Sequence, residues 1–156
     1  MAQFKQPIQY DSAVTLGVAK LRINPARLTA AATGQTLTFN ALAFGQGESQ
    51  LPANARITYA WINIITPFSG GDDVTALTLA LGKAGATTEL LTAVSIFTGS
   101  TGLKPKTGAY ALGAPEAAYA PVVTLAATDG NLNTLTTGLV EVLIQYEAIS
   151  SASLTA

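Results

Sequence analysis

The stretch from Leu51 to Gly82 constrains the fold more than any other part of the chain, because it has the pattern of two β-strands joined by a turn. The turn, Ser69-Gly70-Gly71-Asp72-Asp73, is made of residues that tolerate positive φ. Period-two alternation on both sides of it is typical of half-buried strands. We therefore expect a hairpin at the centre of the core. The predicted same-face sets are Ile57, Tyr59 and Trp61 in the first strand and Leu77, Leu79 and Leu81 in the second.

Three further segments show strand patterns. Residues 36–40 would point Leu37 and Phe39 inward, and residues 122–128 form another apolar run before the turn Asp129-Gly130-Asn131. Residues 139–147 would close the domain. The expected inward set of this last strand is Val140, Val142, Ile144 and Tyr146, with Glu141, Gln145 and Glu147 on the other face.

Two segments leave alternatives open. In residues 14–23 the apolar residues change phase between Val18 and Leu21, which indicates either a strand with a bulge near Ala19 or Lys20, or an extended arm ordered by a partner. Residues 88–97 carry apolar residues at helical spacing, which favours one short helix or helical turn, although their β-branched residues favour a strand.

Strands separated by Gly, Pro, Asp and Asn, with almost no helix, predict an all-β domain. The pattern is that of a β-sandwich or jelly roll with at most one short helix. A chain of 156 residues has the size of a single domain. We expect an N-terminal arm or edge strand over residues 1–27, the β-sandwich over 28–148 and a flexible tail over 149–156.

Composition excludes most catalytic chemistry. The chain has no His and no Cys, so Ser-His-Asp and Cys-His sites and the usual zinc sites are impossible. Phosphate-binding loops are missing as well. Glu141 and Glu147 would lie roughly 20 Å apart along one strand, too far for a glycosidase pair. We predict no enzyme activity, no cofactor and no metal site, and we interpret Asp72-Asp73 as a polar turn rather than a calcium site.

The surface must be poor in charge. Charged residues make up 11% of the chain, against about 25% in typical domains. Such a surface resists association weakly, so we expect the chain to live in contact with other protein. The net charge of −1 gives no pull toward nucleic acid or an anionic membrane, and no apolar run approaches the length of a spanning helix, about 20 residues. We expect neither partner, and no secretion signal is recognisable in residues 1–12.

Two regions are candidate contact segments. Residues 99–121 form the longest expected irregular region, and tyrosines in such a loop favour an interface over disorder. Residues 1–27 hold four of the eight basic residues, although a basic cluster of this kind is usually a solvated surface. The candidate contact residues are Phe4, Lys5, Tyr10, Lys104, Lys106 and Tyr110.

Four segments together resemble small structural proteins of tailed-bacteriophage virions, in particular the capsid decoration (cement or head-stabilising) proteins. The likeness covers about residues 30–147. The segments that show this likeness are Leu51-Pro52 with Ala55-Arg56-Ile57, the turn Pro67-Phe68-Ser69-Gly70-Gly71, the strand end Leu77-x-Leu79-x-Leu81-Gly82, and the closing strand Gly138–Glu147.

The resemblance implies a non-enzymatic virion protein with a β-sandwich or jelly-roll domain. It implies assembly in the host cytoplasm, a place on the outside of the capsid, the major capsid protein as partner, and self-association as a homotrimer. The family offers no catalytic residues. Tail, fibre and receptor-binding proteins use similar β-modules, so a tail- or receptor-associated module is the alternative. Sugar-binding aromatic clusters at loop tips would favour that alternative.

Overall fold

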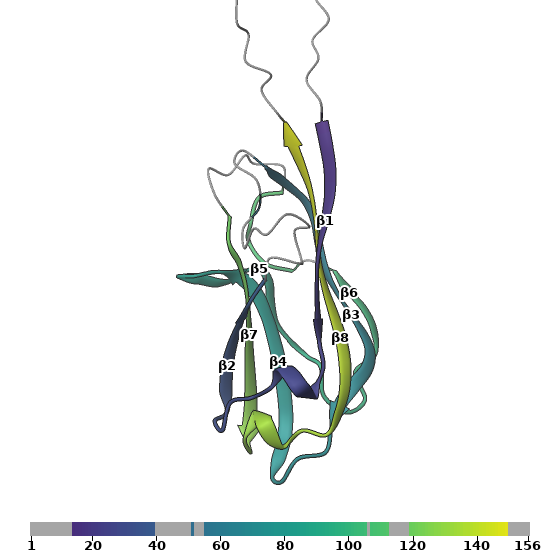
Figure 1. The fold of residues 1–156 in the computed structure, drawn as a ribbon, viewed down its shortest axis with the longest axis vertical. Helices are drawn as coiled ribbons and strands as arrows, with labels where there is room; N and C mark the ends of the chain where they lie inside the picture. The colour runs from purple at the N-terminus through teal and green to yellow at the C-terminus, as the bar shows by residue number, and fades with distance from the viewer. Residues whose placement is uncertain (1–13, 40–50, 52–54, 106, 113–118, 150–156) are drawn as a thin grey trace, which may run out of the picture.

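The computed structural model describes residues 14–39, 51, 55–105, 107–112 and 119–149 (Figure 1). Eight strands and two short 3-10 helices make up the described part. The strands are β1 (Val14–Ile23), β2 (Gly34–Thr38), β3 (Arg56–Ser69), β4 (Val74–Lys83), β5 (Ala86–Ser95), β6 (Gly102–Pro105), β7 (Pro121–Asp129) and β8 (Thr137–Ile149), and the 3-10 helices are η1 (Pro25–Arg27) and η2 (Leu132–Thr134).

The strands form two antiparallel four-stranded sheets, ordered β1-β8-β3-β6 and β2-β7-β4-β5. The first strand of the chain pairs with the last, the second with the second to last, and so on: β1 lies beside β8, β2 beside β7, β3 beside β6 and β4 beside β5. The chain therefore follows one long hairpin, and this hairpin is rolled so that β8 also pairs with β3 and β7 with β4. This nested order is a jelly roll, and it confirms the predicted all-β sandwich.

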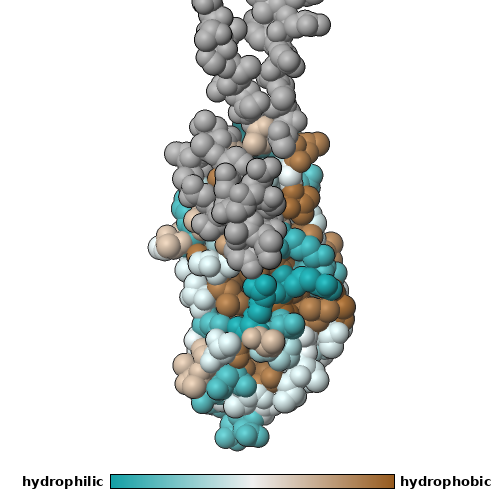
Figure 2. Space-filling view, in the orientation of Figure 1, coloured by the Kyte–Doolittle hydropathy of each residue, from teal (hydrophilic) through white to brown (hydrophobic). Residues whose placement is uncertain are grey.

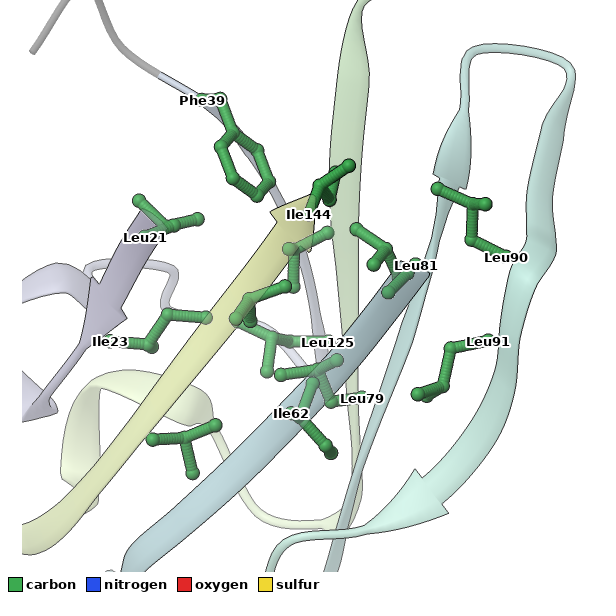
Figure 3. Packing of buried hydrophobic residues seen from close by; sticks show 14 of the residues in the cluster. Leu21, Ile23, Phe39, Ile62, Leu79, Leu81, Leu90, Leu91, Leu125 and Ile144 are labelled. Carbon is green, nitrogen blue, oxygen red and sulfur yellow. The ribbon is translucent and has the colours of Figure 1, made fainter. Parts of the chain in front are cut away.

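The core lies between the two sheets (Figure 3). The predicted inward residues of β4 and β8 are buried, which confirms their alternation. The turn between β3 and β4 is also confirmed, since Gly70, Gly71 and Asp73 all adopt positive φ. Each strand pair contributes apolar side chains to the cluster: Leu21 and Ile23 from β1, Ile62 from β3, Leu79 and Leu81 from β4, Leu90 and Leu91 from β5, Leu125 from β7 and Ile144 from β8.

Strand β3 differs from its predicted pattern because it contains bulges. Between Ile57 and Tyr59 the strand advances two residues while β8 advances one, so Thr58 is an extra residue. A bulge of this kind changes which face the following side chains occupy. Ile57 is fully buried, but Tyr59 and Trp61 lie on the outward face while Ala60 and Ile62 point inward. The prediction that Trp61 shares the inward face of Ile57 is wrong.

Strand β1 contains no bulge. It pairs with β8 at ten consecutive positions from Val14 to Ile23 without a register shift. Ala19, Leu21 and Ile23 are buried, whereas Leu16 and Val18 are exposed. The phase change in the sequence therefore marks apolar residues that face outward, not a bulge.

The predictions for residues 88–97 and 99–121 are corrected as well. Residues 86–95 form strand β5, not a helix. The strand follows a tight turn in which Gly85 has a φ of 84°. A register shift against β4 brings the neighbouring residues Leu90 and Leu91 both into the core, and these leucines gave the segment its helical spacing. The predicted irregular region 99–121 contains the short edge strand β6.

Candidate protein-interaction surface

The outward faces of the two sheets differ in chemistry. The outward face of β2-β7-β4-β5 carries mainly small side chains, because Thr and Ala alternate with the buried leucines and valines of β4 and β7. The residues of this face in β4 and β7 include Ala76, Thr78, Ala80, Thr124, Ala126 and Thr128. No large apolar side chain of β4 or β7 is among the exposed hydrophobic residues.

The outward face of β1-β8-β3-β6, called here the apolar outer face, is different. Its exposed residues and their exposed fractions are Leu16 (67%), Leu103 (58%), Val18 (54%), Ile65 (46%) and Tyr59 (38%). Trp61, Leu139 and Leu143 on the same side are partly exposed. Hydrophobic residues lie among hydrophilic ones on the side of the molecule occupied by these strands (Figure 2). Exposed apolar residues that share one sheet face are typical of a protein-interaction surface.

Strand register connects these residues across the sheet. Leu143 of β8 lies between Lys20 of β1 and Trp61 of β3, and Trp61 in turn lies opposite Pro105 of β6. Two residues further along β3, on the same face, Asn63 lies opposite Leu103 of β6. The apolar outer face therefore has members on all four strands, and polar or charged residues such as Lys20, Glu141 and Gln145 lie among them.

Two aromatic rings stand near the centre of this face. The ring centroids of Tyr59 and Trp61 are 5.2 Å apart, and the rings are tilted by 50°. Both side chains face outward because of the bulge at Thr58. Tyrosine and tryptophan are enriched in the buried centres of protein interfaces.

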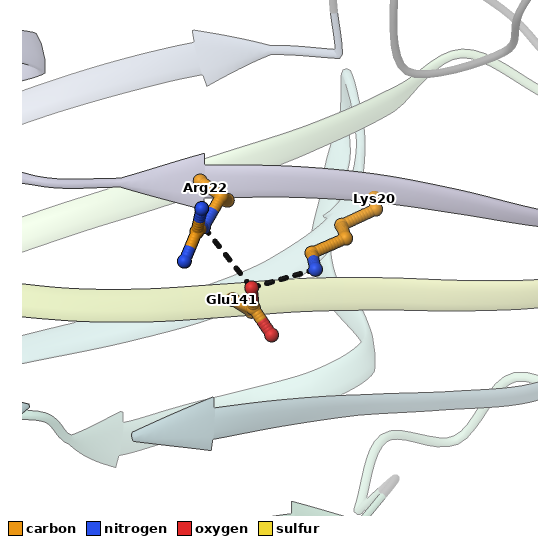
Figure 4. Close-up of polar contacts among 3 residues, drawn as sticks. All are labelled: Lys20, Arg22 and Glu141. Carbon is orange, nitrogen blue, oxygen red and sulfur yellow. Dashed lines mark ion pairs between the residues drawn. The ribbon is translucent and has the colours of Figure 1, made fainter. Parts of the chain in front are cut away.

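An ion-pair cluster lies on the same outward face, at β1 and β8 (Figure 4). Glu141 Oε1 lies 2.6 Å from Lys20 Nζ and 3.1 Å from Arg22 Nε. The side chain of Glu141 is 12% exposed, whereas those of Lys20 and Arg22 are 46% and 61% exposed. Two cations share one carboxylate, so this edge of the sheet keeps a local excess of positive charge.

The sequence-predicted contact residues are divided by the structure. Phe4, Lys5, Tyr10 and Lys106 lie outside the described residues. Lys104 is in β6 opposite Ile62, so its side chain starts on the inward side of the sheet edge. Tyr110 is 9% exposed and packs edge-on against Tyr119 at 5.6 Å, which leaves little of it for a partner. The contact role of these six residues stays a prediction.

Sequence reasoning missed the apolar outer face. One signal was present in the alternation of Leu16 and Val18, whose phase does not match that of Leu21 and Ile23. The outward orientation of the other residues depends on strand pairing that the sequence does not reveal. Predicting it for Tyr59 and Trp61 would have required knowledge of the bulge, and predicting it for Leu103 would have required knowledge of strand β6.

The acidic side chains of the described residues are not gathered into a metal-binding group. The described residues contain no group of three or more His, Cys, Asp or Glu side chains that could hold a metal ion. Asp129, in one of the predicted turns, accepts a hydrogen bond of 2.7 Å from the Thr75 hydroxyl, and both belong to the paired strands β7 and β4. Within the described ranges no helix is long and apolar enough to cross a membrane.

Comparison with known proteins gives a likeness in fold. No protein-family model and no curated protein matches the chain. A solved structure does: a chain of the cyanophage Pam1 capsid asymmetric unit has a similar fold. The TM-score is 0.54 and the sequence identity is 18%, and the match covers 94% of this chain and 93% of that one. The two chains are therefore alike in fold over nearly their whole lengths.

Proposed function

We propose that this chain is a non-enzymatic structural protein of a phage virion, which binds the outside of the capsid and stabilises the shell as a decoration (cement) protein. The observation that carries this proposal is the end-to-end likeness in fold to a chain of a phage capsid asymmetric unit. The absence of His and Cys from the sequence supports a binding role over catalysis.

The apolar outer face is the surface proposed to contact the major capsid protein. Tyr59 and Trp61 would supply the aromatic centre of that contact, and Leu103 and Ile65 would enlarge it. The Thr- and Ala-rich face of the other sheet would then face away from the shell.

Stabilisation would follow from mass action. A protein that binds the assembled shell and not its dissociated subunits shifts the equilibrium toward the shell. Association as a homotrimer would add avidity, because three linked contacts hold more firmly than one. Assembly would take place in the host cytoplasm.

The test is a mixing experiment with expanded shells that lack the protein. The full chain is added over a range of concentrations, and co-sedimentation and the temperature of shell disruption are recorded. We expect saturable binding and a raised disruption temperature. A folded protein that does not sediment with the shells would contradict the proposal.

Matched variants locate the contact. Leu103→Ser and Ile65→Ser remove exposed apolar side chains from the apolar outer face, and Leu112→Ser removes a leucine outside the strands that is about as exposed as Ile65. We expect the first two variants to lower shell occupancy and Leu112→Ser to leave it unchanged. Equal losses for all three would contradict the assignment of this face. Binding to bacterial surface glycans in place of shells would favour the tail or receptor-binding alternative.

A further inference from the structure

The four edge strands of the two sheets are not alike. β2 spans five residues, β6 spans four, and β5 shifts register twice against β4. β1 is ten residues long and pairs with β8 in unbroken register. No other described strand pairs with the far side of β1. β1 is thus the long, regular edge of the described sheets.

β1 has fewer of the devices that protect sheet edges: its two charged residues, Lys20 and Arg22, both lie on the outward side and share Glu141. β6 ends in Pro105, which has no N–H to donate, and Lys104 starts on its inward side. In β1 the inward positions from Gly17 to Ile23 carry no charge, and the strand contains no proline. A long, regular edge with neither a proline nor an inward charge can pair with another strand.

The outward side of β1 has two halves. Leu16 and Val18 are apolar and more than half exposed, and Lys20 and Arg22 are basic. An antiparallel copy of the same strand reverses this order, so that the apolar half of one strand meets the basic half of the other. The stems of Lys and Arg pack well on apolar side chains while their charged ends stay in water.

We propose that β1 pairs antiparallel with β1 of a second copy of this chain, so that two β1-β8-β3-β6 sheets join across a two-fold axis. Directly opposed residues share a face. With Val18 on the axis, Leu16 lies opposite the partner's Lys20. With Ala19 on the axis, Val18 lies opposite the partner's Lys20. Registers centred on Lys20 or Leu21 would oppose like charges and are disfavoured.

This contact is independent of the capsid. It forms through the edge of β1, whereas the proposed shell contact centres on Tyr59, Trp61, Ile65 and Leu103 of β3 and β6, and it requires no shell to be present. If the chain also forms the proposed homotrimer, the two-fold contact joins two trimers. The mass in solution is then an even multiple of the chain mass in either case.

The first test measures mass in solution by sedimentation equilibrium on the full chain. Val18→Lys places an added charge at the proposed axis, and Leu103→Lys adds the same charge at a similarly exposed position on the opposite edge strand β6. We expect Val18→Lys to halve the mass and Leu103→Lys to leave it unchanged, with both variants folded by circular dichroism. A wild-type monomer, or a mass insensitive to Val18→Lys, would overturn the proposal.

The second test uses the absence of cysteine from the sequence. Opposed residues of paired strands lie close enough for a disulfide. We expect Val18→Cys alone, or its mixture with Lys20→Cys if Ala19 lies on the axis, to form linked pairs at least tenfold faster than Leu103→Cys. Linking no faster than that of Leu103→Cys would overturn the proposal.

Discussion

Tyr59 and Trp61 lie side by side on the solvent side of β3, with ring centroids 5.2 Å apart, because Thr58 is an extra residue in the strand. If Thr58 were instead paired in regular alternation, Tyr59 and Trp61 would lie on the same inward face as Ile57. One bulge therefore creates the aromatic centre of the apolar outer face.

The single tryptophan offers a direct probe of this surface. We expect 5-fluorotryptophan at Trp61 to give one 19F resonance that shifts and broadens when shells are added, because the proposed contact covers the ring. Leu112→Ser should preserve the change and Leu103→Ser should weaken it. A resonance that keeps its position while the protein sediments with the shells would show that binding uses another surface.

The bulge itself can be tested by deleting Thr58. The deletion should leave Ile57 inward and Tyr59 outward, because these two residues already lie opposite consecutive residues of β8 and would then alternate as in a regular strand. We expect the free energy of unfolding to fall by less than about 1.5 kcal/mol, the lower end of what burial of an isoleucine contributes. Urea unfolding measures the loss. Thr58→Ala, which keeps the residue count, is the control, and a loss of about 3 kcal/mol or more for the deletion alone would contradict this account of the bulge.

Gly17 and Tyr146 make a second testable pair. They lie opposite each other in β1 and β8, and a Cβ at position 17 would lie 2.3 Å from Tyr146 Cζ. We expect Gly17→Ala to lower the free energy of unfolding by about 1–3 kcal/mol through overpacking.

The control is Gly34→Ala in edge strand β2, where the nearest atom to a new Cβ would be 3.8 Å away. This variant should be as stable as the wild type or slightly more stable. If Tyr146 causes the loss, Gly17→Ala combined with Tyr146→Leu should lose less than the sum of the two single changes. Additive losses in thermal or urea unfolding would contradict the contact.

The ion-pair cluster predicts a salt-dependent loss. Glu141→Gln removes the carboxylate shared by Lys20 and Arg22, and we expect about 1 kcal/mol of destabilisation because both partners are largely solvated. The loss should shrink in 1 M salt. Glu147→Gln is the control: this residue is on the same strand face, and no ion pair joins it to another described residue. Losses that are equal for the two variants would contradict a role for the pairs.

The sequence by itself determined the fold class, the turns and the inward faces of the regular strands. Alternation in β4 and β8 was sufficient, because β4 pairs with β7 and β8 pairs with β1 without a register shift over the predicted inward residues. The turn at Gly70 and Gly71 could also be predicted from the sequence, since a positive φ favours glycine.

Only the tertiary structure decided which apolar residues face the solvent. The side of Trp61 depends on a bulge that forms against β8, and the strand character of Leu90 and Leu91 depends on a register shift against β4. The exposure of Leu16 follows from the place of β1 at a sheet edge. Each of these outcomes is set by a strand distant in the chain, and local periodicity carries no information about the partner.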